Sequence, residues 1–253
     1  MVEKYKKRVY WDVVNDVIKE ADIVLEVLDA RFVEQTRNKE IEDKVKRLNK
    51  PLIYVLNKCD LIEKEEAEKQ KKKFENCIFM SATKKYGSTM LLHEILRQSK
   101  VGSKIGRIIV GVLGYPNTGK SSVINVLVGR QSAKTSPVSG FTSGLQMIKI
   151  TKNIYLMDTP GVIPYKEEDA VKHMLIASKN PSDIQNIHSA AVELIKMAKG
   201  RIEEHYGVEK GTPDSVLKRI AIKYNRVKKG GVPDTEVVAR KMIQDWQRGK
   251  IRV

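Results

Sequence analysis

The segment that decides the fold is Gly114-Tyr-Pro-Asn-Thr-Gly-Lys-Ser121, which fits the pattern G-x-x-x-x-G-K-[ST]. It follows the apolar run Ile108 to Leu113 and precedes a helical pattern at Lys120 to Gly129. Glycines let such a loop curl so that successive N–H groups point at phosphates, while the following helix presents its positive end. The spacing therefore predicts a nucleoside triphosphate site between a strand and a helix.

The side chains of this phosphate loop have expected roles. Lys120 is predicted to bridge β- and γ-phosphate oxygens, and the Ser121 hydroxyl is predicted to bind Mg²⁺. Further contacts with the nucleotide are expected from the other loop positions, which are Gly114, Pro116, Asn117, Thr118, Gly119 and Ser122.

Two motifs downstream extend this site. Asp158-Thr-Pro-Gly161 closes the apolar run Ile154 to Met157, where Asp158 can hold a Mg²⁺-bound water and the Gly161 N–H can meet the γ-phosphate. Gly140-Phe-Thr142 offers the Thr142 hydroxyl to the metal when the third phosphate is present. The residues predicted to act in hydrolysis are Lys120, Thr142, Asp158 and Gly161.

A second pair of motifs indicates which base is bound. Asn57-Lys-Cys-Asp60 and Ser81-Ala-Thr83 each follow an apolar run. The Asp60 carboxylate can accept hydrogen bonds from guanine N1 and N2, which adenine cannot supply. We expect Asn57 to tie this loop to the phosphate loop and the stem of Lys58 to lie along the base. Ser81 belongs to the same reader, with the Ala82 N–H meeting the guanine carbonyl oxygen.

The order of these motifs is permuted. In most GTPases the phosphate loop (motif G1) comes first and the guanine readers (motifs G4 and G5) come last. Here the order is G4-G5-G1-G2-G3, so the guanine readers precede the phosphate loop. Joining the same strands by different loops preserves a sheet if the original ends lie close together. In this order, the segment predicted to meet the metal, which carries Thr142 and Asp158, continues directly into the carboxyl-terminal part.

Short branched apolar runs alternate with helical patterns, so an α/β fold is predicted, with a mostly parallel six-stranded sheet and flanking helices. The runs are Ile23–Leu28, Leu52–Leu56, Ile78–Met80, Ile108–Leu113, Leu145–Ile150 and Ile154–Met157, the last two joined by a hairpin at Lys152 and Asn153. Helices are expected near Asn38–Asn49, Lys64–Phe74, Thr89–Gln98 and Lys120–Gly129, with a linker at Gln98–Gly106.

After Pro164 the strand-like runs stop and helical patterns take over. We therefore predict a permuted G domain at residues 1–164 and a small all-α domain at residues 165–253. Its helices are expected around Asp169–Ser178, Ile184–Tyr206, Asp214–Lys228 and Thr235–Arg248.

Composition excludes several classes of protein. No apolar stretch approaches the roughly 18 to 20 residues that cross a bilayer, and the charged start does not resemble a Sec signal. Cys59 and Cys77 cannot form a disulfide framework, so reduced thiols and a cytoplasmic location are expected. The formal charge of +16 over 253 residues fits a partner such as nucleic acid, or else a lysine-rich solvated surface.

The carboxyl-terminal part carries candidate contacts to RNA. From Asp214 to Val253 there are many more Lys and Arg than acidic residues, and several recur at helical spacing before a glycine turn. A solvated charged face is the alternative, because Tyr224 and Trp246 are the only aromatic side chains there. The candidates are Lys218, Arg219, Lys223, Arg226, Lys228, Lys229, Lys241 and Arg248.

In this order, these motifs resemble the circularly permuted GTPases of the YlqF (RbgA) type, which act in assembly of the large ribosomal subunit. The likeness extends to Asp29-Ala-Arg31 with Thr36-Arg-Asn38, and to the tail from Lys228 to Lys250. It implies GTP or GDP with Mg²⁺ as ligands and a partner in rRNA or a large-subunit precursor, with no membrane partner. A monomer off the ribosome is also expected. Asn117 is linked in related GTPases to K⁺ coordination, and a loop-bracing amide is the alternative.

The chain departs from this family at two places. Val33 stands where the family has a proline, and the first histidine is His93 rather than a histidine near the amino terminus. Val162 also occupies the position after D-x-x-G where Ras-like GTPases carry the glutamine that orients the attacking water. We therefore expect slow turnover that needs K⁺ or RNA. The substitutes considered are His93, His173, His188 and His205, against the alternative of ordinary core or surface histidines.

The function predicted is a GTP-hydrolysing switch whose helical domain binds rRNA during large-subunit assembly. Two alternatives stay open. One is an RNA-binding scaffold in which GTP is a structural ligand, and the other is a GTPase that acts on tRNA or another partner.

Overall fold

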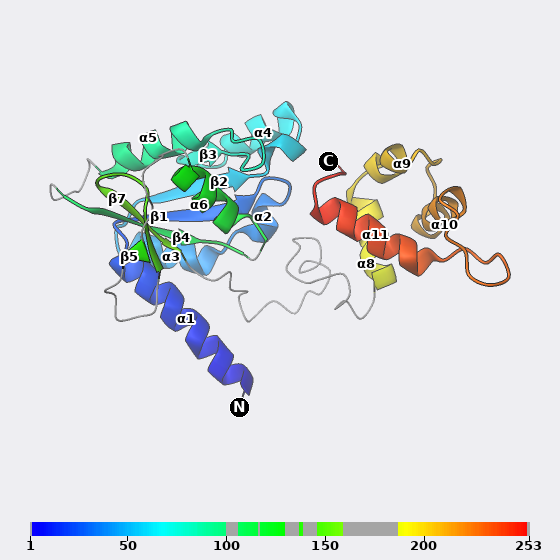
Figure 1. Cartoon of the computed structure of the whole chain (residues 1–253), viewed down its shortest axis with the longest axis horizontal. Helices are drawn as coiled ribbons and strands as arrows, with labels where there is room; N and C mark the ends of the chain where they lie inside the picture. Colours follow the sequence, from blue (N-terminus) through cyan, green and yellow to red (C-terminus); the bar gives the residue numbers. More distant parts are fainter. Residues whose placement is uncertain are drawn as a thin grey trace. The chain divides into compact units, whose positions relative to one another are not determined.

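The computed structural model describes residues 2–99, 106–115, 117–129, 137–138, 146–158 and 187–251, without the side chains of residues 2–10, 137, 138, 146 and 158. Contacts divide the chain into two compact units, Met1–Glu167 and Glu168–Val253. The first contains a sheet with helices on both faces, and the described part of the second is helical (Figure 1).

Seven strands form the sheet within the described residues, in the order β3-β2-β1-β4-β7-β6-β5. The first five in this order are parallel, and β6 and β5 continue the sheet in antiparallel pairing. The strands are β1 Ile23–Asp29, β2 Leu52–Asn57, β3 Cys77–Phe79, β4 Ile108–Leu113, β5 Pro137–Val138, β6 Gln146–Lys149 and β7 Ile154–Asp158.

This sheet confirms the predicted fold class. All six apolar runs are strands, and the hairpin at Lys152 and Asn153 joins β6 to β7. The two residues of β5 add a seventh strand that was not predicted, because a pair of residues is too short to show a period of two.

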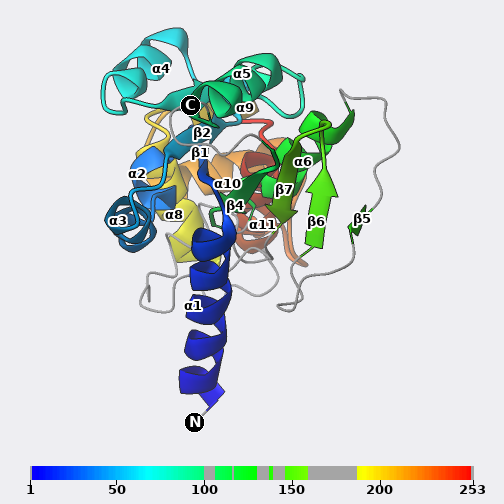
Figure 2. The same cartoon turned by 90° about the vertical axis from the view of Figure 1, so that its left-hand side faces the viewer.

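Helices cover both faces of the sheet. On one face α5 (Ser88–Ser99) and α6 (Lys120–Gly129) pack through Leu91, Ile95 and Leu127 onto alternate side chains of the central strands. On the other face lie α1 (Val2–Glu20) and α3 (Lys39–Arg47). Figure 2 shows that α1 continues well beyond the edge of the sheet. The central strands are therefore buried on both sides, as a parallel sheet requires.

The remaining elements of the first unit are short. They are α2 (Val33–Thr36), the 3₁₀ helix η1 (Cys59–Leu61) and α4 (Lys64–Lys71). Helix α1 was not predicted, and it packs closely because Gly111 on β4 has no side chain. A Cβ at Gly111 would lie 2.7 Å from Val17 Cγ1. Most of the expected linker at Gln98–Gly106 lies outside the described residues.

The second unit contains α8 (Ile187–Met197), α9 (Arg201–Tyr206), α10 (Pro213–Lys223) and α11 (Thr235–Gln247). The single run predicted at Ile184–Tyr206 is two helices, because Lys199 and Gly200 have positive φ angles that end α8. The helix expected at Asp169–Ser178 lies outside the described residues.

Side-chain caps start the last two helices. Thr212 accepts a hydrogen bond from Ser215 N at the start of α10, and Asp234 accepts one from Val237 N at the start of α11. Trp246 on α11 is buried. Among the helices that the structure describes, none combines the length and apolar character needed to cross a bilayer.

A carboxyl group is buried in the middle of the sheet. Glu26 on β1 accepts a hydrogen bond from Asn38 N at 2.8 Å, while its Oε2 has no hydrogen-bond partner among the described residues. Nearby, Glu42 binds Arg37 and accepts a hydrogen bond from the Tyr54 hydroxyl. Burial and the charge of Glu42 raise the pKa of Glu26 to about 8, against the opposing effects of Asn38 N and Arg37.

Glu26→Gln is expected to remove a pH dependence of stability. Between the ordinary pKa of 4.5 and about 8 the folded chain keeps a proton that the unfolded chain releases, so stability falls as the pH rises. At pH 9 the variant should exceed the wild type by roughly 2 to 4 kcal/mol in free energy of unfolding, and at pH 5 the two should be nearly equal. Urea unfolding at the two pH values measures this.

The exposed Glu40 on α3 supplies the control for this experiment. Glu40→Gln should follow the wild type at both pH values, because a substitution at this exposed position changes no buried contact. Equal losses of stability in the wild type and in Glu26→Gln between pH 5 and pH 9 would contradict a protonated Glu26.

Candidate functional site

The carboxyl ends of the parallel strands meet at one edge of the sheet, and the predicted motifs lie there. Asp29 ends β1, Asn57 ends β2, and Asp158 ends β7. The phosphate loop follows β4 directly, while Ser81 lies shortly after β3. Ligands of open α/β sheets bind outside this edge, so the topology brings the two groups of motifs to one side of the molecule.

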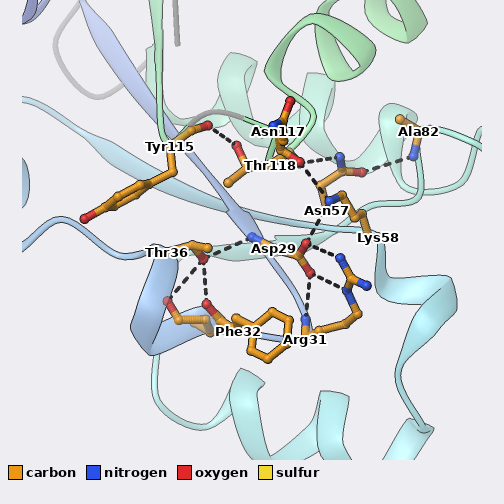
Figure 3. Close-up of polar contacts among 11 residues, drawn as sticks. Asp29, Arg31, Phe32, Thr36, Asn57, Lys58, Ala82, Tyr115, Asn117 and Thr118 are labelled. Atoms are coloured by element: carbon orange, nitrogen blue, oxygen red, sulfur yellow. Dashed lines mark hydrogen bonds and ion pairs between the residues drawn. The ribbon is translucent and has the colours of Figure 1, made fainter. Parts of the chain in front are cut away.

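The side chain of Asn57 joins two of these loops (Figure 3). Its Nδ2 donates to the Thr118 carbonyl at 2.8 Å, and its Oδ1 accepts from Ala82 N at 3.2 Å. Asn57 is buried, so both ends of the amide are satisfied within the protein. This amide holds the phosphate loop and the Ser81–Thr83 segment at a fixed separation.

Close packing of the backbone shapes the phosphate loop. Gly114 has φ +145°, and a Cβ there would lie 2.4 Å from Val27 O. Gly119 has φ +95°, and a Cβ there would lie 2.2 Å from Asn57 Nδ2. Both positions therefore require glycine, because an L side chain would be strained and would also clash.

Side chains of the phosphate loop and of the start of α6 complete this region. Lys120 is buried, and its Nζ donates to the carbonyls of Gly114 and Tyr115 at 2.9 and 2.8 Å. The Thr118 hydroxyl donates to Tyr115 O at 2.9 Å. Ser121 and Ser122 are exposed in the first turn of α6. An amine and exposed hydroxyls at a helix start are the donor set that a phosphate with a bound Mg²⁺ requires.

The two segments predicted to read the base form short turns. Asp60 lies half-buried in η1, and within the described part of the chain no hydrogen bond or ion pair engages its carboxylate. The Ser81 Oγ accepts from Lys84 N at 3.1 Å, while the backbones of Ser81 and Tyr86 exchange two hydrogen bonds. These bonds close the loop that holds Ala82.

A carboxylate to which the motifs assigned no role lies beside Lys58, in the first of these turns. Asp29 is buried and accepts from Arg31 Nε and Nη2 at 3.0 and 2.7 Å, and from Lys58 Nζ at 2.8 Å. Burial alone would raise the pKa of Asp29, but the charges and hydrogen bonds of Arg31 and Lys58 lower it to about 2. Burial lowers the pKa of Lys58. The signal in the sequence was the motif Asp29-Ala-Arg31, which is part of the family resemblance but had no predicted role.

Four predicted site residues are not positioned by the described structure. Pro116, Thr142 and Gly161 lie outside the described residues, and Asp158 is described only by its backbone. That backbone ends β7 beside β4, so the strand that carries Asp158 neighbours the strand that leads into the phosphate loop. Among the expected Mg²⁺ ligands, the described structure thus gives the environment of the Ser121 side chain alone.

In the second unit, several of the predicted RNA contacts have structural partners. Arg219 donates to the carbonyls of Glu209 and Lys210, and Lys223 donates to those of Tyr206 and Gly207. The bonds of Lys223 satisfy carbonyls that the end of α9 leaves unpaired, and those of Arg219 hold the segment between α9 and α10. Lys241 pairs with the buried carboxylate of Asp245. Two cations of α10, Arg219 and Lys223, therefore bond to the protein's own backbone, although their helical spacing predicted a face that contacts RNA.

Three other candidate cations, Arg226, Lys228 and Lys229, lie on an ordered turn, where Lys228 Nζ is 3.9 Å from Asp234 Oδ1. Lys228 N bonds to Val232 O and Asp234 N bonds to Arg226 O, each at 2.8 Å, so the chain from 226 to 234 folds back on itself. Gly230 and Gly231 at its tip have positive φ angles. The exposed residues on and beside this turn include Ile222, Tyr224, Arg226, Val227, Lys228, Lys229 and Val232, while Lys218 and Arg248 are exposed elsewhere.

Comparison with known proteins places this geometry among GTPases. Residues 109–218 match the family model of the 50S ribosome-binding GTPases. The chain is 41% identical to the uncharacterized GTP-binding protein MJ1464 of Methanocaldococcus jannaschii, over 99% of this chain and 68% of that protein. It is 34% identical to nucleolar GTP-binding protein 2 of Yarrowia lipolytica over 95% of this chain, but spans only about half of that relative, 49% of its length.

Solved structures give the same likeness. The GNP-bound structure of YlqF from T. maritima superposes with a TM-score of 0.66 at 25% identity, over 94% of this chain and 93% of that one. The GDP-bound structure of T. maritima YlqF gives a TM-score of 0.68 at 25% identity, over 95% and 96% of the two chains. The motif order, the sheet and the helical unit are thus all found together in related proteins.

Gly119→Ala is expected to lower the free energy of unfolding of the first unit by about 2 kcal/mol, because the new methyl group clashes with Asn57 at a positive φ. Chemical unfolding measures the loss. Gly129→Ala is the matched control, since nothing lies within 4 Å of the added methyl group at the end of α6. Equal stability of the two variants would contradict the close contact between Asn57 and the loop.

Proposed function

This chain belongs to the circularly permuted GTPases of the YlqF type, and from that premise we propose that it binds and hydrolyses GTP and acts in large ribosomal subunit assembly through rRNA. The proposal includes a cytoplasmic protein that is monomeric off the ribosome. The nucleolar relatives carry their location in their names, and this chain spans about half the length of the one compared above, 49%. Activity, ligands and partners of the whole protein are therefore part of the proposal.

The observation that supports GTP binding best is the bridge through Asn57. Thr118 and Ala82 are 61 and 25 residues away from Asn57 along the chain, yet both bond to its amide. A loop suited to phosphates and a turn suited to a base are thereby held at opposite ends of one side chain. A single nucleotide could therefore place its phosphates at the loop and its base at the turn.

The proposed base is guanine. The Asp60 carboxylate engages no partner within the described residues and can accept the N1 and N2 protons of guanine, whereas adenine presents an unprotonated N1 there. Lys58 lies beside the phosphate loop, where its Nζ donates to Asn117 O at 2.8 Å. Its stem is proposed to lie along the base, with the Ala82 backbone beside the guanine carbonyl.

The proposed phosphate contacts come from the loop and from α6. Lys120 would exchange its bonds with Gly114 O and Tyr115 O for phosphate oxygens, and Ser121 would hold Mg²⁺ together with Asp158 and Thr142. Mg²⁺ when bound would offset the negative charge of the β- and γ-phosphates. Since Val162 cannot orient water, turnover is proposed to be slow without rRNA or K⁺, with Asn117 as the residue that would meet K⁺.

Two measurements test this proposal. Calorimetry with GDP and with ADP should give binding with GDP alone, and equal binding would defeat the guanine assignment. GTP hydrolysis should then be compared in KCl and NaCl, with and without large ribosomal subunits. Turnover of several per second without a partner would contradict partner stimulation, and no turnover under any condition would favour the RNA-binding scaffold. Stimulation by tRNA instead of subunits would favour the other alternative.

The proposed RNA surface is the turn around residues 226–234. Arg226, Lys228 and Lys229 are exposed there beside Tyr224 and Val227, so phosphate-binding cations adjoin side chains that can meet sugars or unstacked bases. By contrast, Lys223 bonds to carbonyls at the end of α9, and Arg219 bonds to carbonyls of the segment that follows α9. The turn is therefore favoured over the face of α10.

Asp60→Asn is expected to weaken GDP binding by about 100-fold and to strengthen binding of XDP, because an amide cannot accept both guanine protons but can donate to the second carbonyl of xanthine. Calorimetry with both nucleotides measures the switch. Glu75→Gln removes an exposed charge after α4 and should leave both affinities unchanged. Unchanged GDP affinity in Asp60→Asn would contradict the role of Asp60.

Replacing Lys228 and Lys229 together by Ala is expected to weaken rRNA binding by about tenfold and to reduce the slope of log affinity against log salt by about 2. Filter binding at several salt concentrations measures both quantities. Lys69→Ala with Lys72→Ala removes the same charge from exposed positions around the end of α4 and should change neither. Equal losses in the two double variants would indicate attraction by overall charge rather than by the turn.

A further inference from the structure

Asp29 and Arg31 form an ion pair that is sealed from solvent beside Lys58, in the first of the two segments predicted to read the base. The exposed fraction of the Arg31 side chain is 0% and that of Asp29 is 1%. Two nitrogens of the guanidinium bind the two carboxylate oxygens, and Arg31 N donates to Asp29 Oδ1 at 3.1 Å. Such a two-pronged contact fixes the orientation of both groups.

The same carboxylate also holds Lys58. Lys58 Nζ lies 2.8 Å from Asp29 Oδ2 and 2.8 Å from Asn117 O, so one ammonium group links the end of β1 to the phosphate loop. Lys58 has a positive φ of 63°, which turns the chain sharply between β2 and η1. The position of its stem is thus set at two points, the backbone turn and the ammonium group.

Backbone contacts hold Asp29 itself in place. Asp29 N donates to Thr36 Oγ1 at 3.1 Å, and that hydroxyl donates to Phe32 O at 2.7 Å. Next to it, Ala30 N donates to Asn57 O at 2.8 Å. Figure 3 shows the contacts of Thr36, Arg31 and Lys58 converging on Asp29. The carboxylate therefore cannot swing away from Lys58 without breaking several hydrogen bonds.

Two cations share one carboxylate in this arrangement. Arg31 and Lys58 both bind Asp29 Oδ2, at 2.7 and 2.8 Å, so the two positive groups approach each other closely. Their mutual repulsion is offset by the negative charge between them, and the effect is large because the site is buried. Neutralising Asp29 would therefore push the ammonium group of Lys58, the less buried of the two cations, away from the loop.

We propose that Asp29 is a positioning residue of the guanine nucleotide site, which orients Lys58 for the base and the phosphate loop, and that Arg31 tunes this attraction. The inference rests on the proposed function, because it assigns Lys58 to a bound guanine nucleotide. It gives a role to the Asp29-Ala-Arg31 motif, which has no direct place in the phosphate or base contacts. The predicted consequence is in nucleotide affinity, not in the chemical step.

The test compares Asp29→Asn with the double variant Asp29→Asn/Arg31→Met. The single variant leaves Arg31 and Lys58 in mutual repulsion, so its Kd for GDP should rise by about tenfold or more. The double variant removes the repulsion and should return the Kd to within about threefold of the wild type. KM for GTP should follow the same pattern while kcat at saturating GTP changes by less than about twofold.

A purely structural role would give the opposite pattern, because removing a second buried group would weaken the site further. A double variant with a higher Kd than Asp29→Asn, or an unchanged Kd in Asp29→Asn, would overturn the proposal. Arg37→Met is the matched control, since Arg37 lies in the same connection after β1 and is also gripped by a carboxylate, that of Glu42. It should lower the unfolding temperature and leave the Kd for GDP unchanged.

Folding of each variant is checked by thermal unfolding before binding is measured. If Asp29→Asn does not fold, Arg31→Lys takes its place, because it keeps the charge and loses the two-pronged contact. Its Kd should rise by about threefold or more, and an unchanged Kd would overturn the proposal. Failure of the wild type to bind GDP would defeat the proposed function itself, whereas normal wild-type binding with unaffected variants would defeat this inference alone.

Discussion

The contact on which the site depends is the buried amide of Asn57. A buried amide left without partners costs about 1 to 3 kcal/mol, so its bonds to Thr118 and Ala82 form together with the fold. Because one planar group makes both bonds, the phosphate loop and the base-reading turn keep a fixed spacing. Gly119 completes this constraint, since only a residue without a side chain leaves room for the amide.

The parts of the molecule that could be predicted from the sequence are those that local chemistry decides. The strand at Ile108 to Leu113 and the helix at Lys120 to Gly129 have the predicted bounds. The branched apolar run ends where the glycine loop begins, and a helix typically follows a loop of this motif. Local chemistry also starts two helices of the second unit, where the side chains of Thr212 and Asp234 cap the helices that follow them.

Other features could not be predicted, because they depend on residues far away in the sequence. Lys223 has the spacing of an exposed cationic face, yet its ammonium group satisfies carbonyls at the end of α9, 16 and 17 residues earlier. Helix α1 escaped prediction for a related reason. Its apolar positions, among them Val17, form a face only where Gly111 lets the helix lie close to β4. Asp29 likewise shows its role only once Lys58 is beside it.

The order of strands explains why a permuted chain can build this site. Strand β1 lies between β2, which carries the base-reading turn, and β4, which leads into the phosphate loop. The base-reading turn and the phosphate loop therefore meet across the end of β1, whichever of them comes first in the chain. That end is occupied by Asp29, from which Arg31 and Lys58 are both held. Strand β1 thus supplies a constraint that neither the base-reading turn nor the phosphate loop contains. A permutation that cuts the chain elsewhere leaves this constraint intact.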